Sequence, residues 1–162
     1  MLRMSDRRVQ QFLQSKALLD APEFSPDGRW LAYASDESGR REIYVQPYPG
    51  HGGKYQISTE GGTEPMWNRN GRELFYRNGD KMMAADISTQ AGFTAGKPRQ
   101  LFESRYRMNA VGQADANYDV SSDGQRFLML KPVEQEHAAP TQINVVLNWT
   151  EELKRLVPTG NK

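Results

Sequence analysis

The sequence contains no cysteine, only two histidines and no long apolar run. The absence of cysteine excludes disulfides, thiolate chemistry, cysteine-based zinc sites and iron–sulfur clusters. No segment approaches the ~20 consecutive apolar residues of a membrane-spanning helix, so we expect no membrane insertion. An excess of one charge is also lacking. With 21 basic residues against 20 acidic ones, no overall field draws nucleic acid or anionic lipid to the chain.

The first eight residues carry charges, but no hydrophobic segment follows them. A secretory signal peptide needs such a segment, so the sequence as it stands predicts none and favours the cytoplasm. The 162 residues suffice for a domain with a buried core, and an aromatic content of 10% is not typical of a disordered chain. We therefore expect a single domain over 1–162.

A pattern built around a turn glycine occurs three times, over 22–33, 65–76 and 118–129. Each glycine follows an aspartate or asparagine, residue types that favour tight hairpin turns. Large apolar residues recur four positions before the glycine, three after it and five after it. The glycines are Gly28, Gly71 and Gly124, and the apolar residues are Phe24, Leu31 and Tyr33, then Trp67, Leu74 and Tyr76, then Val120, Phe127 and Met129. Such self-similarity is typical of repeat architectures.

Each turn joins two predicted strands, and the residues that follow supply more, which gives units of four antiparallel strands. The units span 21–58, 63–103 and 116–149. The third unit lacks its fourth strand, because 150–157 predicts a short C-terminal helix that Thr150 would cap. Residues 8–14 match the fourth-strand pattern and would complete the last unit. Many strands are apolar on successive residues, which predicts sheets covered on both faces, as in the blades of a β-propeller.

The segment Ser25-Pro-Asp-Gly-Arg-Trp-Leu-Ala-Tyr33 resembles the propeller repeats of TolB and its relatives. It is also similar to the propellers of prolyl-oligopeptidase-type enzymes and to those that follow bacterial serine/threonine kinase domains. The connector over 57–65, with its Gly-Gly pair, fits the same family, whereas Asn68-Arg-Asn-Gly71 departs from the Ser-Pro-Asp-Gly pattern. The resemblance implies an all-β propeller of six or more blades, and because the family is often periplasmic it leaves the compartment open.

Three blades are too few to close a ring, since propellers typically have four to eight. An open array would expose the flanks of its terminal blades as large apolar patches. We therefore predict a homodimer in which two copies form one six-bladed ring, and residues 8–14 of each chain complete the last blade of the other. The alternative is that the chain is part of a larger propeller.

Residues that could carry catalysis or bind a metal are few. His51 lies in a glycine-rich loop and His137 in an irregular connection, and the sequence has no Gly-x-Ser-x-Gly nucleophile elbow. The turns over 36–39 and 68–73 lack the full run of oxygen ligands of a calcium loop. We therefore expect no catalytic residue, no metal and no cofactor, and a chain that is not an enzyme.

In a propeller, the connections that lead into the inner strands surround one mouth of the central channel. Here these connections are 20–23, 59–64 and 115–117, and they are rich in acidic residues although the whole chain is nearly neutral. The candidate binding residues are Asp20, Glu23, Glu60, Thr63, Glu64, Asp115 and Asn117. We expect a peptide or protein partner with basic or donor-rich segments, and simple solvation of these acids is the alternative.

The sequence thus favours a non-enzymatic β-propeller module that acts as a protein- or peptide-binding scaffold through the channel mouth. The competing hypothesis is a detached sensor or regulatory propeller of a larger kinase or prolyl-oligopeptidase-like enzyme. Neither hypothesis names a ligand, because a fold of this kind hosts many functions.

Overall fold

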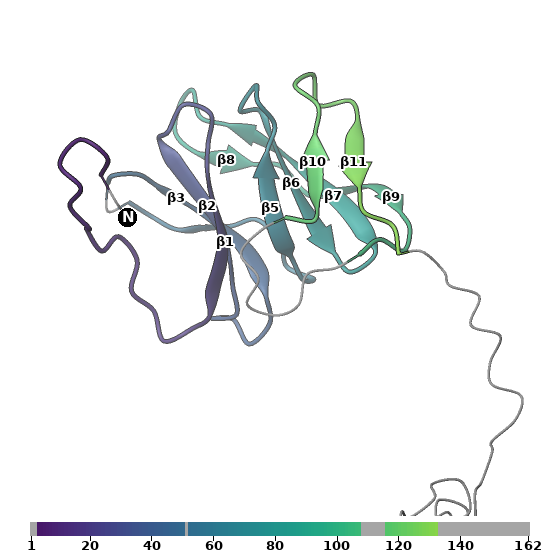
Figure 1. Cartoon of the computed structure of the whole chain (residues 1–162), viewed down its shortest axis with the longest axis horizontal. Coiled ribbons are helices and arrows are strands. Elements are labelled where there is room, and N and C mark those ends of the chain that lie inside the picture. The colour runs from purple at the N-terminus through teal and green to yellow at the C-terminus, as the bar shows by residue number, and fades with distance from the viewer. Residues whose placement is uncertain (1–2, 51, 108–115, 133–162) are drawn as a thin grey trace, which may run out of the picture. The chain divides into compact units, whose positions relative to one another are not determined.

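The computed structural model of the chain describes residues 3–50, 52–107 and 116–132, which form eleven β-strands and, within these ranges, no helix (Figure 1). All pairs of these strands are antiparallel, and they form three sheets in sequence order. The prediction of an all-β chain with antiparallel sheets is confirmed for this part of the sequence. A search of the same residues for a helix that could cross a membrane finds none.

The first sheet contains β1 (Leu19–Phe24), β2 (Trp30–Ser35), β3 (Glu42–Pro47) and β4 (Tyr55–Gln56), hydrogen-bonded in that order. In β2, Leu31 and Tyr33 lie on one face and Ala32 and Ala34 on the other, and all four side chains are buried. A strand that is buried on both faces belongs inside a stack of sheets rather than at a surface.

The second sheet contains β5 (Thr63–Trp67), β6 (Glu73–Asn78), β7 (Lys81–Ser88), β8 (Thr94–Ala95) and β9 (Arg99–Glu103). The long β7 pairs with β9 over its first half and with the short β8 at its last two residues. The sequence predicts four strands here, and β8 is a fifth that its pattern does not reveal, because a two-residue strand is too short to show alternation.

The third sheet is a hairpin of β10 (Tyr118–Val120) and β11 (Phe127–Met129). Several predictions fall outside the described residues: the strands of the third unit beyond 132, the helix over 150–157, Asp115, His51 and His137. That each chain forms three blades therefore stays a prediction.

The turn between the first two strands has the same structure in each sheet. Its φ angles are 69° at Gly28, 69° at Gly71 and 72° at Gly124. This left-handed backbone favours glycine, because other residues carry a Cβ that is strained there. The Ser25 hydroxyl donates a hydrogen bond to the Asp27 carboxylate at 2.6 Å and accepts one from the Trp30 amide at 3.0 Å. The first of these bonds is the main reason that the pKa of Asp27 is lowered to about 2. Ser121 and Asp123 make the same contacts in the third sheet. The serine and the aspartate of the Ser-x-Asp-Gly pattern therefore stabilise this turn.

Successive sheets pack face to face through fixed positions of the repeat. We call the face with the residues three and five after the glycine the front face of a sheet, and the face with the residues four and six after it the back face. The back face of the first sheet meets the front face of the second in one buried cluster, whose members include Ala32, Ala34, Ile43 and Val45, then Trp67, Leu74 and Tyr76. The first sheet thus presents small side chains to the aromatic residues of the second.

The second and third sheets repeat this arrangement. Phe75 on the back face of the second sheet lies edge-on to Phe127 on the front face of the third, with ring centroids 5.0 Å apart. Met82 and Val120 belong to the same buried cluster. Figure 1 shows β5 between β1 and β10, the first strands of the three sheets. Successive sheets among these three therefore pack face to face.

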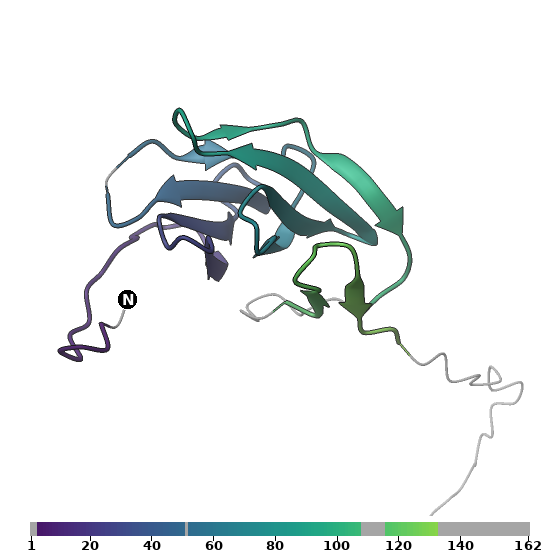
Figure 2. The same ribbon diagram turned by 90° about the horizontal axis from the view of Figure 1, so that it is seen from above.

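Residues 8–14, which we call the N-terminal arm, form no named strand. Phe12 and Leu13 pack instead on the front face of the first sheet, against the cluster of Leu31, Tyr33 and Tyr44. Figure 2, seen from above, shows the N-terminal segment on the side of the first sheet away from the third. Because the predicted strand exchange requires a second copy, it stays a prediction.

The connector from the first sheet to the second is fixed by a buried carboxylate. Glu42 accepts the Gly61 amide at 3.0 Å and the Ser58 hydroxyl, and it pairs with Arg40. A Cβ at the next residue, Gly62, would lie 2.6 Å from Ser58 Oγ and 2.7 Å from Ile43 Cγ1. The second glycine of the Gly-Gly pair in this connector is therefore required by close packing.

We expect Gly62→Ala to lower the free energy of unfolding by about 1–3 kcal/mol, because the added methyl group overpacks this site. The matched control is Gly53→Ala, where a Cβ would have no heavy atom within 4 Å, and we expect a change within about 0.5 kcal/mol there. Urea denaturation followed by tryptophan fluorescence measures both. Equal effects of the two substitutions would contradict the packing argument.

Candidate functional site

The first strands of the three sheets line a pocket of about 270 Å3, which we call the inner pocket. Its wall consists of Ala21, Pro22, Glu23, Pro65, Met66, Ala116, Tyr118 and Asp119. Pro22, Pro65 and Tyr118 are the first residues of the three repeats and so occupy the same repeat position. Most of the wall is apolar, and Glu23 and Asp119 are its acidic members.

Glu23 joins the first sheet to the second. Its Oε2 accepts the backbone amide of Trp67 at 3.2 Å, which satisfies a donor on the free edge of β5. The pKa of Glu23 is raised to about 7, chiefly by burial, with the Trp67 amide lowering it and the negative charge of Asp119 raising it. Glu23 therefore changes its charge near neutral pH.

Glu64 joins the second sheet to the third in the same way. Its side chain is buried, and its Oε2 accepts the backbone amide of Asn117 at 3.0 Å. Its carbonyl oxygen accepts the Tyr118 hydroxyl at 2.8 Å. The backbone of Glu64 has φ 53°, within the left-handed region that few residues other than glycine adopt. Ala21 occupies the equivalent position in the first repeat and has φ 47°, so the first two repeats share this backbone conformation.

A buried cation lies near the inner pocket. Arg77 is fully buried at the end of β6, and its Nε and Nη2 donate to the carbonyl of Gly79 at 3.2 and 2.9 Å. Tyr118 is also buried, and burial holds its pKa well above the usual range, with Glu23 and Glu64 adding to this and Arg77 opposing it. Tyr118 is therefore a neutral hydrogen-bond donor at physiological pH.

The remaining mouth residues have separate roles. Asp20 is buried and paired with Arg41, and burial raises its pKa while Arg41 lowers it. Glu60 is exposed. The buried Oγ1 of Thr63 and Nδ2 of Asn117 have no hydrogen-bond partner among the residues that the structure describes. The structure thus brings Glu23, Glu64 and Asn117 together at the inner strands and leaves Glu60 in solvent.

Sequence reasoning missed the apolar part of the inner pocket. Met66 and Asp119 occupy the same repeat position as Glu23, five residues before the glycine, and Pro22 and Pro65 stand one residue earlier. The alignment of the three repeats contains this signal. The apolar residues of the inner pocket could have been predicted from those repeat positions whose side chains point away from both neighbouring sheets.

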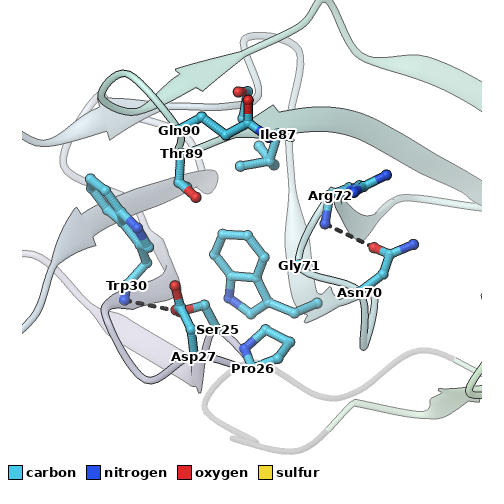
Figure 3. A pocket seen from close by; sticks show the side chains of 12 residues that line it. Ser25, Pro26, Asp27, Trp30, Asn70, Gly71, Arg72, Ile87, Thr89 and Gln90 are labelled. Atoms are coloured by element: carbon cyan, nitrogen blue, oxygen red, sulfur yellow. Dashed lines mark hydrogen bonds between the residues drawn. The ribbon is translucent and has the colours of Figure 1, made fainter.

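A second, larger pocket of about 470 Å3 lies between the turns of the first and second sheets (Figure 3). Pro26, Trp30 and Ile87 give it an apolar surface, while Asp27 and Asn70 stand on its rim (Figure 3). These two polar side chains are engaged within their own turns, because the Asp27 carboxylate pairs with Arg29 and Asn70 Oδ1 accepts the Arg72 amide at 2.8 Å. This pocket therefore follows from the turn structure.

The described residues contain no cluster of three or more aspartate, glutamate or histidine side chains that could hold a metal ion. The inner pocket offers an apolar wall, two carboxylates and the Tyr118 ring. An acid pair of this kind favours a cationic group of a partner, since a positive charge between two negative ones relieves their repulsion.

No family model matches the sequence, and no curated protein matches it either. Among solved structures, the chain is similar to a TolB candidate from Agrobacterium tumefaciens, with a TM-score of 0.50 and 18% sequence identity. The fold is TolB-like. The alignment covers 63% of this chain and 39% of that protein, so the chain spans well under half of its length. At this identity the likeness concerns the fold and carries no activity.

The raised pKa of Glu23 predicts a pH-dependent stability. Its proton is held more tightly in the folded state, with a pKa of about 7, than in the unfolded chain, where a glutamate has its ordinary pKa of 4.5. This contribution to stability is full below about pH 4.5 and is lost as the pH rises through 7. Glu23→Gln keeps an acceptor for the Trp67 amide without the charge. We expect it to stabilise the protein at pH 8 by about 1–2 kcal/mol and to have little effect near pH 4.5.

Chemical denaturation at the two pH values measures this difference. Glu60→Gln is the matched control, because it removes the charge of an exposed carboxylate in a neighbouring connector, and we expect it to change stability equally little at both pH values. A Glu23→Gln variant whose stability follows the same pH dependence as the parent protein would contradict the raised pKa.

Proposed function

We propose that the chain is a non-enzymatic β-propeller module that binds a peptide or protein segment at the inner pocket. The observation that carries this proposal is the pair of carboxylates, Glu23 and Asp119, in an otherwise apolar pocket. Neither carboxylate has an ion pair within the described part of the chain. The buried acids Asp20 and Glu42, in contrast, each have an arginine.

The size of the pocket supports a side chain as the occupant. Its volume of about 270 Å3 lies below the roughly 300–1,000 Å3 of pockets that bind drug-sized ligands. A lysine or arginine side chain could pass its apolar stem along Pro22, Pro65 and Met66 and place its charge at Glu23 and Asp119. A protein segment with a basic residue among apolar ones is therefore the partner that fits.

The competing function, a sensor or regulatory propeller of a larger kinase or prolyl-oligopeptidase-like enzyme, is favoured by one observation. The chain covers 39% of the TolB candidate to which its fold is similar. In such a protein the same inner pocket would bind the segment that controls the enzyme. Genomic sequence that joins this chain in one reading frame to a kinase or hydrolase domain would support it.

Selection of peptides from a random phage-displayed library on the purified chain tests the proposed function. We expect the selected peptides to share one lysine or arginine flanked by apolar residues. Their affinity, measured by calorimetry with the synthetic peptides, should fall at least about tenfold for the Glu23→Gln, Asp119→Asn double variant, which corresponds to about 1.4 kcal/mol. The control, Glu60→Gln, keeps both carboxylates of the pocket and should leave the affinity unchanged.

Selected peptides without a basic residue, or peptides that bind the double variant as tightly as the parent chain, would overturn the proposed function. Circular dichroism of the double variant shows whether it is folded.

A further inference from the structure

The repeat provides an internal control for how deeply each position should be buried. Position four before the glycine is 4% exposed at Trp67 in the second sheet, but 42% exposed at Phe24 in the first. The difference arises because the first sheet is followed by a sheet but not preceded by one. Phe24 therefore marks a front face that lacks its neighbour.

The back face of the third sheet shows the same deficit. Position four after the glycine is 1% exposed at Phe75 in the second sheet and 72% exposed at Leu128 in the third. Leu130, six after the glycine, is 50% exposed, whereas the equivalent Ala34 and Arg77 are fully buried. A leucine at these positions gains stability only where another sheet covers it.

We propose that these two faces cover each other in a dimer, with the back face of the third sheet of one copy on the front face of the first sheet of a second copy. The contact continues an interface that the chain already makes twice. In the buried cluster between the second and third sheets, Phe75 is the back-face residue and Val120 the residue four before the glycine. Leu128 and Phe24 hold the same two repeat positions.

The front face of the first sheet has room for the partner's leucines. The N-terminal arm covers part of this face and leaves an apolar groove of about 430 Å3. The groove is lined chiefly by Phe12, Leu13, Leu19, Phe24, Leu31 and Tyr33. Leu128 and Leu130 of the second copy are the side chains that the register of the repeat places there.

If the two copies are related by a two-fold axis, they form a closed ring. The contact joins two different faces, so a single contact would leave one front face and one back face open. Two copies related by a two-fold axis form the contact twice and leave neither face exposed. The proposal goes beyond peptide binding at the inner pocket and does not depend on it, because that pocket lies within one chain.

The oligomeric state of the full chain tests the proposal. Sedimentation equilibrium at micromolar concentration should give twice the mass of the chain. The variants Leu128→Asp and Phe24→Asp change exposed side chains on opposite faces, and we expect each to weaken the dimer at least 100-fold while circular dichroism shows an intact fold. Gln125→Asp, an exposed position in the third turn, is the control and should remain a dimer.

Mixing the two variants distinguishes this contact from one in which like faces meet. In each homodimer of a variant, both contacts carry the substitution, whereas in the heterodimer one contact joins two unsubstituted faces. We therefore expect a heterodimer that is more stable than either homodimer of a variant. A monomeric parent chain would overturn the proposal and assign the two faces to further sheets of a longer protein. A dimer unaffected by either substitution, or a mixture without heterodimer, would overturn it as well.

Discussion

The described structure depends on one constraint: both faces of each sheet carry apolar side chains. In β2, the front-face residues Leu31 and Tyr33 alternate with the back-face residues Ala32 and Ala34, and no face is left for solvent. Each sheet must therefore lie between two others or be covered by another segment. The burial of apolar surface drives this stacking, because each Å2 that is removed from water lowers the free energy by about 25 cal/mol. It also explains why the N-terminal arm lies on the first sheet.

Carboxylates take part in the stacking at the inner edge, where apolar contact cannot satisfy the backbone. The first strand of each sheet has an edge without a neighbouring strand, and a buried amide without an acceptor costs about 1–3 kcal/mol. Glu23 and Glu64 reach across to the next sheet and accept such amides. Glu23 also lines the inner pocket, so one of the two groups that join the sheets contributes to the acidic character of the pocket.

The sequence predicts the local structure of this chain well and its long-range polar contacts poorly. The glycine turns, the strands beside them and the alternation in β2 and β6 follow from residues within about ten positions of one another. Glu23 contacts the Trp67 amide and Glu64 contacts the Asn117 amide, and both contacts join residues more than forty positions apart. The sequence therefore suggests an acidic mouth at Asp20, Glu23 and Glu64. It cannot show that Asp20 pairs with Arg41, or that Glu23 and Glu64 each accept a backbone amide of the next sheet. The pair of Glu23 and Asp119 emerges only when the sheets are stacked.

The repeated turn has a consequence for how the chain acquires its structure. The polar contacts that shape the turn, such as those among Ser25, Asp27 and Trp30, join residues at most five positions apart. A hairpin of this kind forms within microseconds and needs little loop closure. Each sheet can therefore begin as an independent hairpin during synthesis, and docking against the preceding sheet becomes the slower, cooperative step. An array assembled in this order tolerates gain or loss of a whole repeat far better than the loss of a few residues within one, because a cut between hairpins leaves every turn intact.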